Sequence, residues 1–381
     1  MNDKPQKRVV IARSNAVDPD SRVEKEANTL AKNGYSVTLL AWDRSANYKI
    51  KEDVKTLNDG SVRRVSFGAK ADFGAGFKSL VPFLKFQKRL CRWLRKHSDE
   101  YDVAHLCDYD TALFGARVAR RKKKKVIFDV FDYKSHDAST LPKKLFKKWE
   151  DSIINKADAT VICTEKRREQ IASATPKRLT VIHNTPEAVV PAEEQNRPDD
   201  GVVRIVYVGI LQDRRLLKEI MKVVAGMEGV ELHIGGFGKY EAYVKEQAEA
   251  HANIVWHGKL PYAETLRLES ACDIMLAVYD PTVPNHVFAA PNKFYEGLFL
   301  GKPLIMVKNT GMSEVVEENG IGEIITYSEE GFKTGLENLI ARRSEWADIS
   351  ATMKELYRTQ YNWKEMETRL LDLYASLENE A

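Results

Sequence analysis

Residues 291–303 combine a cation, a carboxylate and a predicted helix start in one short stretch. We expect a helix to begin at Asn292 and an apolar strand to follow it. A helix N-terminus attracts anions because its first N–H groups lack intrahelical partners. Lys293 would add positive charge, and Glu296 could accept hydrogen bonds from paired sugar hydroxyls. The stretch predicts a site for a diphosphate beside a ribose, and a capped helix with an exposed glutamate is the alternative. The expected binding residues are Pro291, Asn292, Phe294 and Glu296.

Two arginines and three glycines between residues 209 and 238 are suited to the same ligand. Gly209 ends a predicted strand, and Arg214 and Arg215 follow at the expected start of a helix. Two guanidinium groups there could bind a diphosphate through paired hydrogen bonds, although a solvated basic pair fits the sequence equally well. Gly236 and Gly238 follow the next predicted strand, where glycine allows either close approach of a ligand or a tight turn.

Acidic residues follow predicted strands in the first half of the chain. Asp108 comes shortly after the strand 103–106, and Asp132 comes shortly after the strand 126–130. Side chains at the carboxyl ends of parallel strands line the usual ligand site of such sheets. These carboxylates could bind acceptor hydroxyls or accept a proton, and turn capping is the structural alternative.

A basic segment, 77–97, carries seven Lys or Arg residues and no acid, interleaved with aromatic and aliphatic residues. This pattern indicates a helix lying on an anionic membrane surface, with an amphipathic helix packed on its own sheet as the alternative. Nucleic acid is disfavoured because no recognised binding module accompanies the charge. The residues expected at the membrane are Lys85, Lys88, Arg92, Trp93 and Arg95.

Charge and composition bound the class of protein. The chain has 381 residues, 43% hydrophobic and 30% charged, which suits a globular protein of two domains. Residues 1–190 hold 39 Lys and Arg against 24 Asp and Glu, net +15, so the remainder is net −11 within the total of +4. The basic half therefore suggests contact with an anionic surface. The four cysteines are widely spaced, and no apolar signal core precedes the first strand, so we expect a cytoplasmic protein with reduced thiols.

Strand and helix patterns alternate along the whole chain, which is typical of parallel α/β sheets. We expect two doubly wound Rossmann-like domains facing across a cleft, with the C-terminal helix crossing back to the N-terminal domain. The expected boundaries are 1–185 for the N-terminal domain, 186–202 for a linker, 203–355 for the second domain and 356–381 for the C-terminal helix. The first strand lacks a GxGxxG motif, which argues against a nicotinamide enzyme.

Taken in order, these motifs resemble the family-4-type retaining glycosyltransferases of the GT-B fold. The resemblance spans nearly the whole chain, and its strength lies in the order of motifs that are individually weak. The matching segments are 20–27, 34–38, 102–105, 157–162, Asn184, 207–209, 234–238, 256–258, 271–273 and 291–303. It implies an N-terminal acceptor-binding domain, a second domain for a nucleotide diphosphate sugar donor, retention of anomeric configuration, and no cofactor or metal. It also assigns Glu296 to the nucleotide ribose. Beside it, we expect Asp20, Arg22 and Asp108 on the acceptor side, and catalytic roles for Arg214, Arg215, Lys293 and Asp132.

Three positions depart from the family pattern. The first glutamate of the family's E-x7-E pair is Phe288, and the arginine that normally follows the strand glycine is Ile210. Arg215 fills the family's lysine position, and Phe131 replaces a histidine often found in the first domain. The parts that would contact the sugar are therefore altered, whereas the parts that would hold the nucleotide persist.

The sequence thus predicts a cytoplasmic glycosyltransferase at the inner face of the cell membrane. Its acceptor would be a hydroxyl of a lipid-linked, polysaccharide or cell-envelope glycan precursor. Two alternatives remain open: a catalytically weakened donor-binding subunit that needs a partner, and a nucleotide-sugar epimerase on the same fold. The sugar, the base and the oligomeric state are not specified by these motifs.

Overall fold

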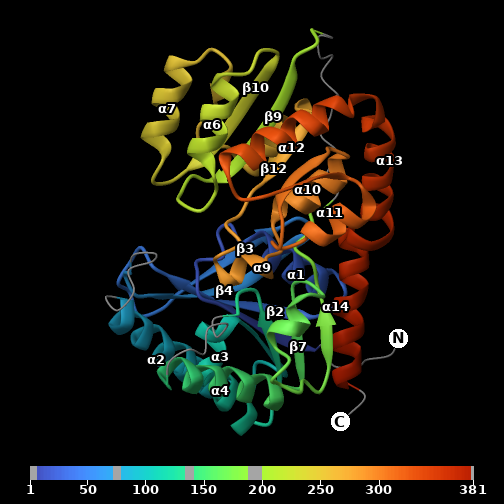
Figure 1. Cartoon of the computed structure of the whole chain (residues 1–381). Coiled ribbons are helices and arrows are strands. Elements are labelled where there is room, and N and C mark those ends of the chain that lie inside the picture. The colour runs from blue at the N-terminus through green and yellow to red at the C-terminus, as the bar shows by residue number, and fades with distance from the viewer. Residues whose placement is uncertain (1–6, 72–78, 134–140, 188–199, 379–381) are drawn as a thin grey trace. The chain divides into compact units, whose positions relative to one another are not determined.

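The computed structural model describes residues 7–71, 79–133, 141–187 and 200–378 of the chain (Figure 1). It divides into two compact units, one of residues 1–183 with 366–381 and one of residues 184–365. We call them unit 1 and unit 2. The linker predicted at 186–202 falls mostly on residues 188–199, which lie outside the described residues.

Unit 1 is built on an eight-stranded sheet with the strand order β3-β4-β2-β1-β5-β6-β7-β8. All neighbouring strands are parallel except β3, which is antiparallel to β4. The strands are β1 (Arg8–Arg13), β2 (Ser36–Asp43), β3 (Lys51–Leu57), β4 (Gly60–Gly68), β5 (Val103–Cys107), β6 (Lys125–Val130), β7 (Ala159–Ile162) and β8 (Leu179–Val181). The helices are α1 (Ser21–Lys32), α2 (Leu80–Lys96), α3 (Asp108–Arg121), α4 (Leu141–Lys156) and α5 (Arg167–Gln170).

Unit 2 has a six-stranded, entirely parallel sheet with the order β11-β10-β9-β12-β13-β14. The strands are β9 (Val203–Ile210), β10 (Val230–Phe237), β11 (Ile254–Trp256), β12 (Ile274–Ala277), β13 (Leu304–Val307) and β14 (Gly322–Ile325). The α-helices are α6 (Leu217–Ala225), α7 (Glu241–Ala250), α8 (Tyr262–Ala271), α9 (Pro284–Val287), α10 (Asn292–Leu300), α11 (Ser313–Asn319), α12 (Glu329–Ala341) and α13 (Trp346–Leu356). A 3₁₀ turn (Arg343–Glu345) precedes α13 and a π-helical turn (Tyr357–Tyr361) follows it.

The two sheets, parallel except at the edge strand β3, confirm the predicted α/β class. The strand order reverses beside β1 in unit 1 and beside β9 in unit 2, because each of these first strands has neighbours from both directions. Ligands of such sheets bind at this switch point, outside the carboxyl ends of the strands. The carboxyl ends of β1 and β5, and of β9 and β12, are therefore where side-chain chemistry is expected.

The C-terminal helix α14 (Trp363–Glu378) belongs to unit 1 from Met366 onward. Its Tyr374 is buried, and the hydroxyl lies 2.9 Å from Nδ1 of His105 on β5. Tyr374 also packs edge-on against Tyr35, with ring centroids 5.5 Å apart. Thus the last helix returns to the first sheet, as the sequence predicts.

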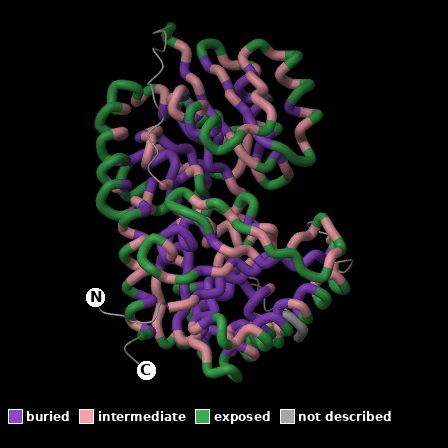
Figure 2. The backbone as a smooth tube through the Cα atoms, turned by 180° about the vertical axis from the view of Figure 1, so that it is seen from behind, coloured by how far each residue is buried: buried purple, intermediate pink, exposed green. Residues whose placement is uncertain are grey.

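The helix α2 has the amphipathic character expected from its sequence, but its aromatic residues face inward. Trp93 is only 3% exposed, and Phe86 is fully buried and stacks on Trp42 with centroids 4.9 Å apart. The prediction that Trp93 contacts a membrane is therefore wrong, because packing on the sheet takes this ring. The predicted cationic residues of the same helix, Lys85, Lys88, Arg92 and Arg95, are all exposed. Figure 2 shows how buried, intermediate and exposed segments follow one another along the backbone.

None of the helices in the described part of the chain combines the length and apolar character needed to cross a bilayer. All four cysteines are free thiols, and three of them, Cys107, Cys163 and Cys272, are buried.

Candidate active site

The carboxyl end of β9 in unit 2 lies against the ammonium group of Lys293. A Cβ atom at Gly209 would lie only 2.8 Å from the Lys293 Nζ, so glycine is what allows this approach. The same Nζ lies 4.7 Å from the ring centroid of Tyr207. Lys293 sits in the first turn of α10, whose N-terminus favours anions. Strand end, helix start and cation therefore meet at one place, as the sequence predicts.

The net effect of its surroundings raises the pKa of Lys293. Burial alone would lower its pKa, but Tyr279, Tyr207, Glu296 and Glu269 together raise it. No carboxylate of the described chain forms an ion pair with its Nζ within 4.0 Å. The ammonium therefore retains positive charge that a bound anion can use.

Arg215 is held by groups that carry no negative charge. Its Nη1 donates to the Arg214 carbonyl at 3.0 Å and lies 3.1 Å from the Nε2 of His286. The guanidinium carbon is 4.2 Å from the ring centroid of Tyr279, a cation–π geometry. The other ring nitrogen of His286, Nδ1, lies 2.9 Å from the Asp280 carbonyl. His286 is thus a neutral imidazole that donates from Nδ1 and accepts at Nε2, which orients Arg215 without neutralising it.

Arg214 differs from its neighbour. Its Nη1 forms an ion pair with Asp280 at 3.0 Å, and its side chain is 57% exposed. Its backbone adopts a left-handed conformation with φ of 68°. Because Asp280 already offsets its charge, Arg214 is the weaker candidate for an anion ligand.

Glu296 is buried at 4% exposure and lies within a small group of acidic side chains. Tyr262 from the start of α8 shares a hydrogen bond with it. Glu269, near the end of α8, is 1% exposed, and its Oε2 has no partner among the described residues. Burial, and then the charge of Glu296, raises the pKa of Glu269 well above its usual range. The arrangement keeps Glu296 as an oriented acceptor beside Glu269.

The remaining residues predicted for this site have mixed outcomes. Gly236 has φ of 136°, and a Cβ there would lie 1.8 Å from the Gly209 carbonyl oxygen, so strand packing requires this glycine. Gly238 has φ of 139° and the same kind of contact, 2.6 Å from the Leu211 carbonyl oxygen. Asn292 is exposed and accepts a hydrogen bond at Oδ1 from Asn184, at 2.7 Å.

Pro291 is the buried N-cap residue of α10. The Phe294 ring is fully buried against Tyr295 and Tyr361, with centroids 5.1 and 5.6 Å away. A ligand contact through the Phe294 ring is therefore excluded, and we correct that residue to the core.

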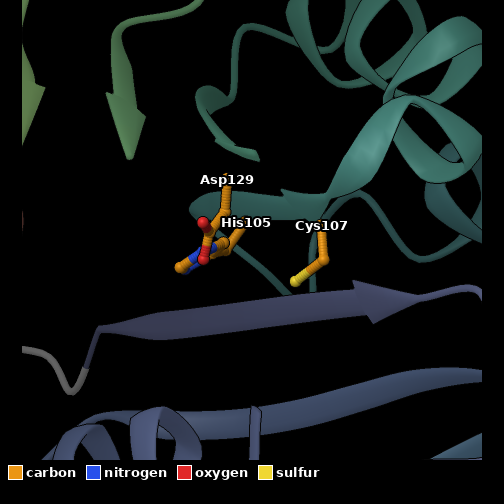
Figure 3. A group of neighbouring side chains, drawn as sticks. All are labelled: His105, Cys107 and Asp129. Carbon is orange, nitrogen blue, oxygen red and sulfur yellow. The ribbon is translucent and has the colours of Figure 1, made fainter. Parts of the chain in front are cut away.

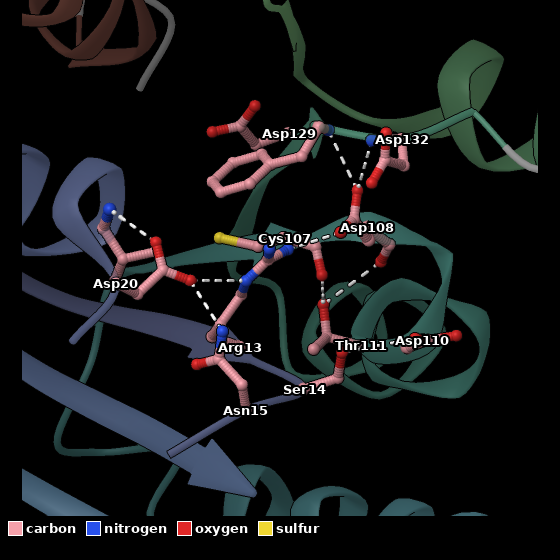
Figure 4. Close-up of polar contacts among 12 residues, drawn as sticks. Arg13, Ser14, Asn15, Asp20, Cys107, Asp108, Asp110, Thr111, Asp129 and Asp132 are labelled. Atoms are coloured by element: carbon pink, nitrogen blue, oxygen red, sulfur yellow. Dashed lines mark hydrogen bonds and ion pairs between the residues drawn. The ribbon is translucent and has the colours of Figure 1, made fainter. Parts of the chain in front are cut away.

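The carboxyl ends of β1 and β5 in unit 1 form a network of ion pairs (Figure 4). Arg13 pairs with Asp20 at 2.9 Å and with Asp108. Asp108 also accepts the backbone N–H groups of Phe131 and Asp132, at 2.9 and 3.0 Å. Burial raises the pKa of Asp108, although Arg13 opposes the shift. Asp20 and Asp108 therefore hold this end of the sheet together through Arg13, an ion-pair role that the sequence did not predict.

Arg22 lies deeper, at 2% exposure, between two acidic groups. Its Nε donates to Glu26 at 3.0 Å and its Nη2 to Asp129 at 2.8 Å. The Phe131 ring lies against both guanidinium groups. Its centroid is 4.3 Å from the Arg22 guanidinium carbon and 4.1 Å from that of Arg13. Arg22 is thus too buried to touch an acceptor in this conformation, and the prediction of an acceptor contact is corrected to a supporting role.

His105, Cys107 and Asp129 point toward one another beneath this network (Figure 3). Their potential ligand atoms lie within 4.8 Å, a grouping that a metal ion could use. Asp129, however, already pairs with Arg22, and His105 Nδ1 bonds to Tyr374. The guanidinium supplies the positive charge that the carboxylate needs, so we interpret the group as a buried ion-pair network.

Asp132 is exposed, unlike Asp20, Arg22 and Asp108, the other residues predicted at this end of the sheet. Its carboxylate is 63% exposed, with Arg167 Nη2 at 3.6 Å. It follows β6, and its backbone N–H bonds to Asp108 (Figure 4). The exposure of Asp132 leaves its carboxylate accessible to a bound hydroxyl, beside its ion pair with Arg167.

Sequence reasoning missed His286, Tyr279, Tyr207 and Glu269. His286 lies in the Pro-containing loop between β12 and α10, where a helix of four residues turns it toward Arg215. Tyr207 lies within an apolar strand run and Tyr279 closely follows one, so both appear as core residues in the sequence. The spacing of Tyr262 and Glu269, two helical turns apart, was the signal that could have placed both on one face of α8.

Comparison with known families and structures agrees with this architecture. Residues 21–185 match glycosyltransferase family 4, and residues 203–342 match glycosyl transferases group 1. No curated protein sequence gives a significant match.

Solved structures with the same fold include a sucrose-phosphate synthase from Thermosynechococcus elongatus, at a TM-score of 0.76 and 15% identity, covering 99% of this chain and 100% of that one. The Anabaena protein Alr3699/HepE, solved with UDP and glucose, gives a TM-score of 0.68 at 12% identity. The match covers 97% of this chain and 100% of that one. A glycosyltransferase from Rickettsia africae gives a TM-score of 0.67 at 12% identity, and the match covers 99% of this chain and 100% of that one.

The structural neighbours share the fold at low identity, and the sequence families account for most of both units. The chain therefore belongs to the family-4-type glycosyltransferases of the GT-B fold.

Proposed function

We propose that the protein transfers a hexosyl group from a nucleotide diphosphate sugar to an acceptor hydroxyl, with retention of anomeric configuration. The observation that carries the proposal is the pair of cations at the carboxyl end of β9 and the start of α10. Lys293 lies against Gly209, and Arg215 is oriented by neutral groups. The Anabaena neighbour solved with UDP and glucose supports a nucleotide-sugar donor.

In the proposed reaction the bond between the anomeric carbon and the diphosphate oxygen breaks, and the acceptor oxygen bonds to that carbon. Negative charge develops on the leaving diphosphate, where Lys293, Arg215 and the α10 N-terminus would stabilise it. Preorganised electrostatic stabilisation of this kind is usually the largest catalytic contribution. The proton of the acceptor hydroxyl would pass to the departing phosphate oxygen, so neither a metal ion nor a cofactor is needed.

Glu296 would accept hydrogen bonds from the ribose hydroxyls, with Tyr262 fixing the carboxylate. On the acceptor side, the exposed Asp132 carboxylate would orient the acceptor hydroxyl. Asp20, Arg22 and Asp108 would keep that end of the sheet in shape. The role of Arg214 would be secondary, because Asp280 already pairs with it.

The proposed acceptor is a lipid-linked or polysaccharide precursor of a cell-envelope glycan, met at the inner face of the cell membrane. The exposed cations of α2 support contact with an anionic surface.

A panel of UDP-, GDP-, ADP- and dTDP-sugars tests the proposal. Free nucleotide together with a glycosylated acceptor of unchanged anomeric configuration, read by NMR, is the expected result. An isomerised donor without transfer would mean an epimerase. Donor binding without turnover would mean a subunit that needs a partner, an outcome that Phe288, Ile210 and Phe131 make worth testing.

A further inference from the structure

Six large apolar side chains of unit 1 are exposed on three neighbouring helices. On α2 they are Leu80, Val81 and Leu84, on α3 Phe114, and on α4 Leu145 and Trp149. Their exposed fractions range from 45% for Phe114 to 61% for Val81. We call these six residues the apolar patch. Large apolar side chains exposed on neighbouring helices mark a candidate interaction surface.

The three helices are adjacent. Gln87 of α2 donates to the carbonyl of Asp110 in the first turn of α3. Tyr109 of α3 packs on Phe146 of α4, with ring centroids 4.2 Å apart. In Figure 1, α3 accordingly lies with α2 and α4 on one side of the sheet of unit 1.

All six residues lie in the first three turns of their helices. Helices that cross over between parallel strands start at the carboxyl end of the sheet. The start of α2 extends past that end, because Arg89, in its third turn, donates to the carbonyl of Gly68, the last residue of β4. The apolar patch therefore lies toward the end of the sheet where Asp108 and Asp132 lie.

The charges around the patch have one sign. Every exposed charged side chain that the structure describes on α2, α3 and α4 is a lysine or arginine. The acids of these helices are buried or half-buried, as with Glu150 and Asp151. Lys85 and Lys88 on α2, and Lys144 and Lys148 on α4, are exposed within the same turns as the apolar residues. Apolar side chains flanked by cations complement an anionic lipid surface, which offers phosphates above an acyl interior.

We propose that the apolar patch inserts into an anionic membrane, and that the acceptor is lipid-linked and reaches Asp132 from that membrane. This surface differs from the basic helix with Trp93 predicted from sequence, because Trp93 is buried and three helices contribute instead of one. The second half of the proposal rests on the proposed transferase function. It chooses the lipid-linked acceptor over the soluble polysaccharide, because the patch lies toward the end of the sheet that carries Asp132.

Co-sedimentation of the full chain with vesicles of phosphatidylglycerol and phosphatidylcholine tests the surface. We expect binding to the anionic vesicles, a remainder that survives 1 M salt, and little binding to pure phosphatidylcholine. The variant Leu84→Ser with Trp149→Ser should bind at least about tenfold more weakly and lose the salt-resistant remainder. A matched control removes two exposed apolar residues elsewhere in unit 1, Ile50→Ser with Val54→Ser, and should bind like the unmodified chain.

Trp149 offers a direct report of insertion. It is 56% exposed, whereas Trp42, Trp93 and Trp363 are buried. Brominated lipids should quench the fluorescence of the unmodified chain more than that of the Trp149→Phe variant. Equal quenching, or equal vesicle binding by the Leu84/Trp149 variant and the control, would overturn the docking surface. Binding to heparin but not to anionic vesicles would also overturn it in favour of a soluble anionic glycan.

The acceptor is tested separately with one active donor. Transfer to a polyprenyl-phosphate-linked saccharide in vesicles should exceed transfer to the same saccharide without lipid by at least about tenfold. Equal transfer to both would overturn the acceptor assignment and leave the transferase intact. Vesicle binding without any donor turnover would instead count against the proposed function and leave the docking surface intact.

Discussion

The carboxyl ends of the two sheets hold their cations in opposite ways. In unit 1, Arg13 and Arg22 are each flanked by two carboxylates. In unit 2, Arg215 is held by a carbonyl, an imidazole and an aromatic ring, and Lys293 by the Tyr207 ring. Unit 1 neutralises its cations internally, whereas unit 2 orients them and leaves their charge for a ligand.

This difference separates cations that stabilise the fold from cations that could bind a ligand. A buried arginine between two carboxylates has little free energy to gain from a further anion, and it is costly to leave unpaired. A cation oriented by neutral groups loses less of its solvation on binding and is already directed. The comparison therefore predicts that breaking the unit 1 network costs stability, whereas changing the unit 2 cations costs binding and rate.

The largest effect is expected for Asp129→Ala, because it leaves Arg22 charged and partly unpaired in the core. Removing one partner of a buried ion pair costs about 3–5 kcal/mol of unfolding free energy. Urea unfolding followed by fluorescence would measure the loss. Asp213→Ala is the control: it removes an exposed partner of Lys239 in unit 2 and should leave the urea concentration at the unfolding midpoint unchanged. If Asp129→Ala unfolds like the unmodified chain, the network does not hold unit 1.

Arg215→Ala should affect the rate and leave stability nearly unchanged. Loss of a preorganised group that stabilises developing charge lowers kcat by about 10²–10³. Arg214→Ala is the matched control and should lose less, since Asp280 already offsets that charge. Steady-state kinetics with the active donor measure both. Equal losses for the two arginines would remove the distinction between neutral and charged partners.

Glu296→Ala should weaken nucleotide diphosphate binding by about 1–3 kcal/mol, the cost of losing hydrogen bonds to a charged acceptor. Calorimetry with the free nucleotide measures this directly. Glu264→Ala, an exposed acid on α8 that pairs with Arg267, serves as the control. An unchanged affinity in the folded Glu296 variant would place the ribose elsewhere.

The sequence predicted the α/β class and most of the strands, because apolar runs bounded by turns set both sheets. It missed β3, whose residues alternate between exposed and half-buried positions and leave no apolar run. The signal was the Asn58-Asp59 turn between β3 and β4. An edge strand pairs through its backbone, so its side chains carry little of the pattern.

The candidate site was predicted where one segment held several groups, as with Lys293 and Glu296. It was not predicted where orientation comes from a distant residue, as with His286 beside Arg215. Burial also divided residues that look alike in sequence: Trp93 and Trp149 both lie in basic helices, yet only Trp149 is exposed. Helical periodicity places a residue on a face, but the partners of that face come from the tertiary fold.

The smallest effect concerns the imidazole that orients Arg215. Burial lowers the pKa of His286, and the charges of Arg215 and Arg214 act in the same direction, while Asp280 opposes them. A histidine whose pKa is lowered by folding contributes stability above a pH of about 6.5, the pKa of histidine in the unfolded chain. That contribution is lost as the pH falls through the lower pKa of the folded state. Protonation would also place an N–H donor at Nε2 of His286, facing the N–H that Arg215 donates. The Tyr279 ring packs edge-on against the imidazole.

Activity should therefore fall on the acid side of pH 6.5, even with the donor saturating. His286→Gln, whose amide oxygen can still accept from Arg215, should keep most of kcat and lose this acid limb. His286→Ala should lower kcat by about tenfold at all pH values, because Arg215 loses its acceptor. A pH–rate profile of the three proteins measures both effects. If the glutamine variant keeps the same acid limb, another group titrates there, and the neutral tautomer is not what holds Arg215.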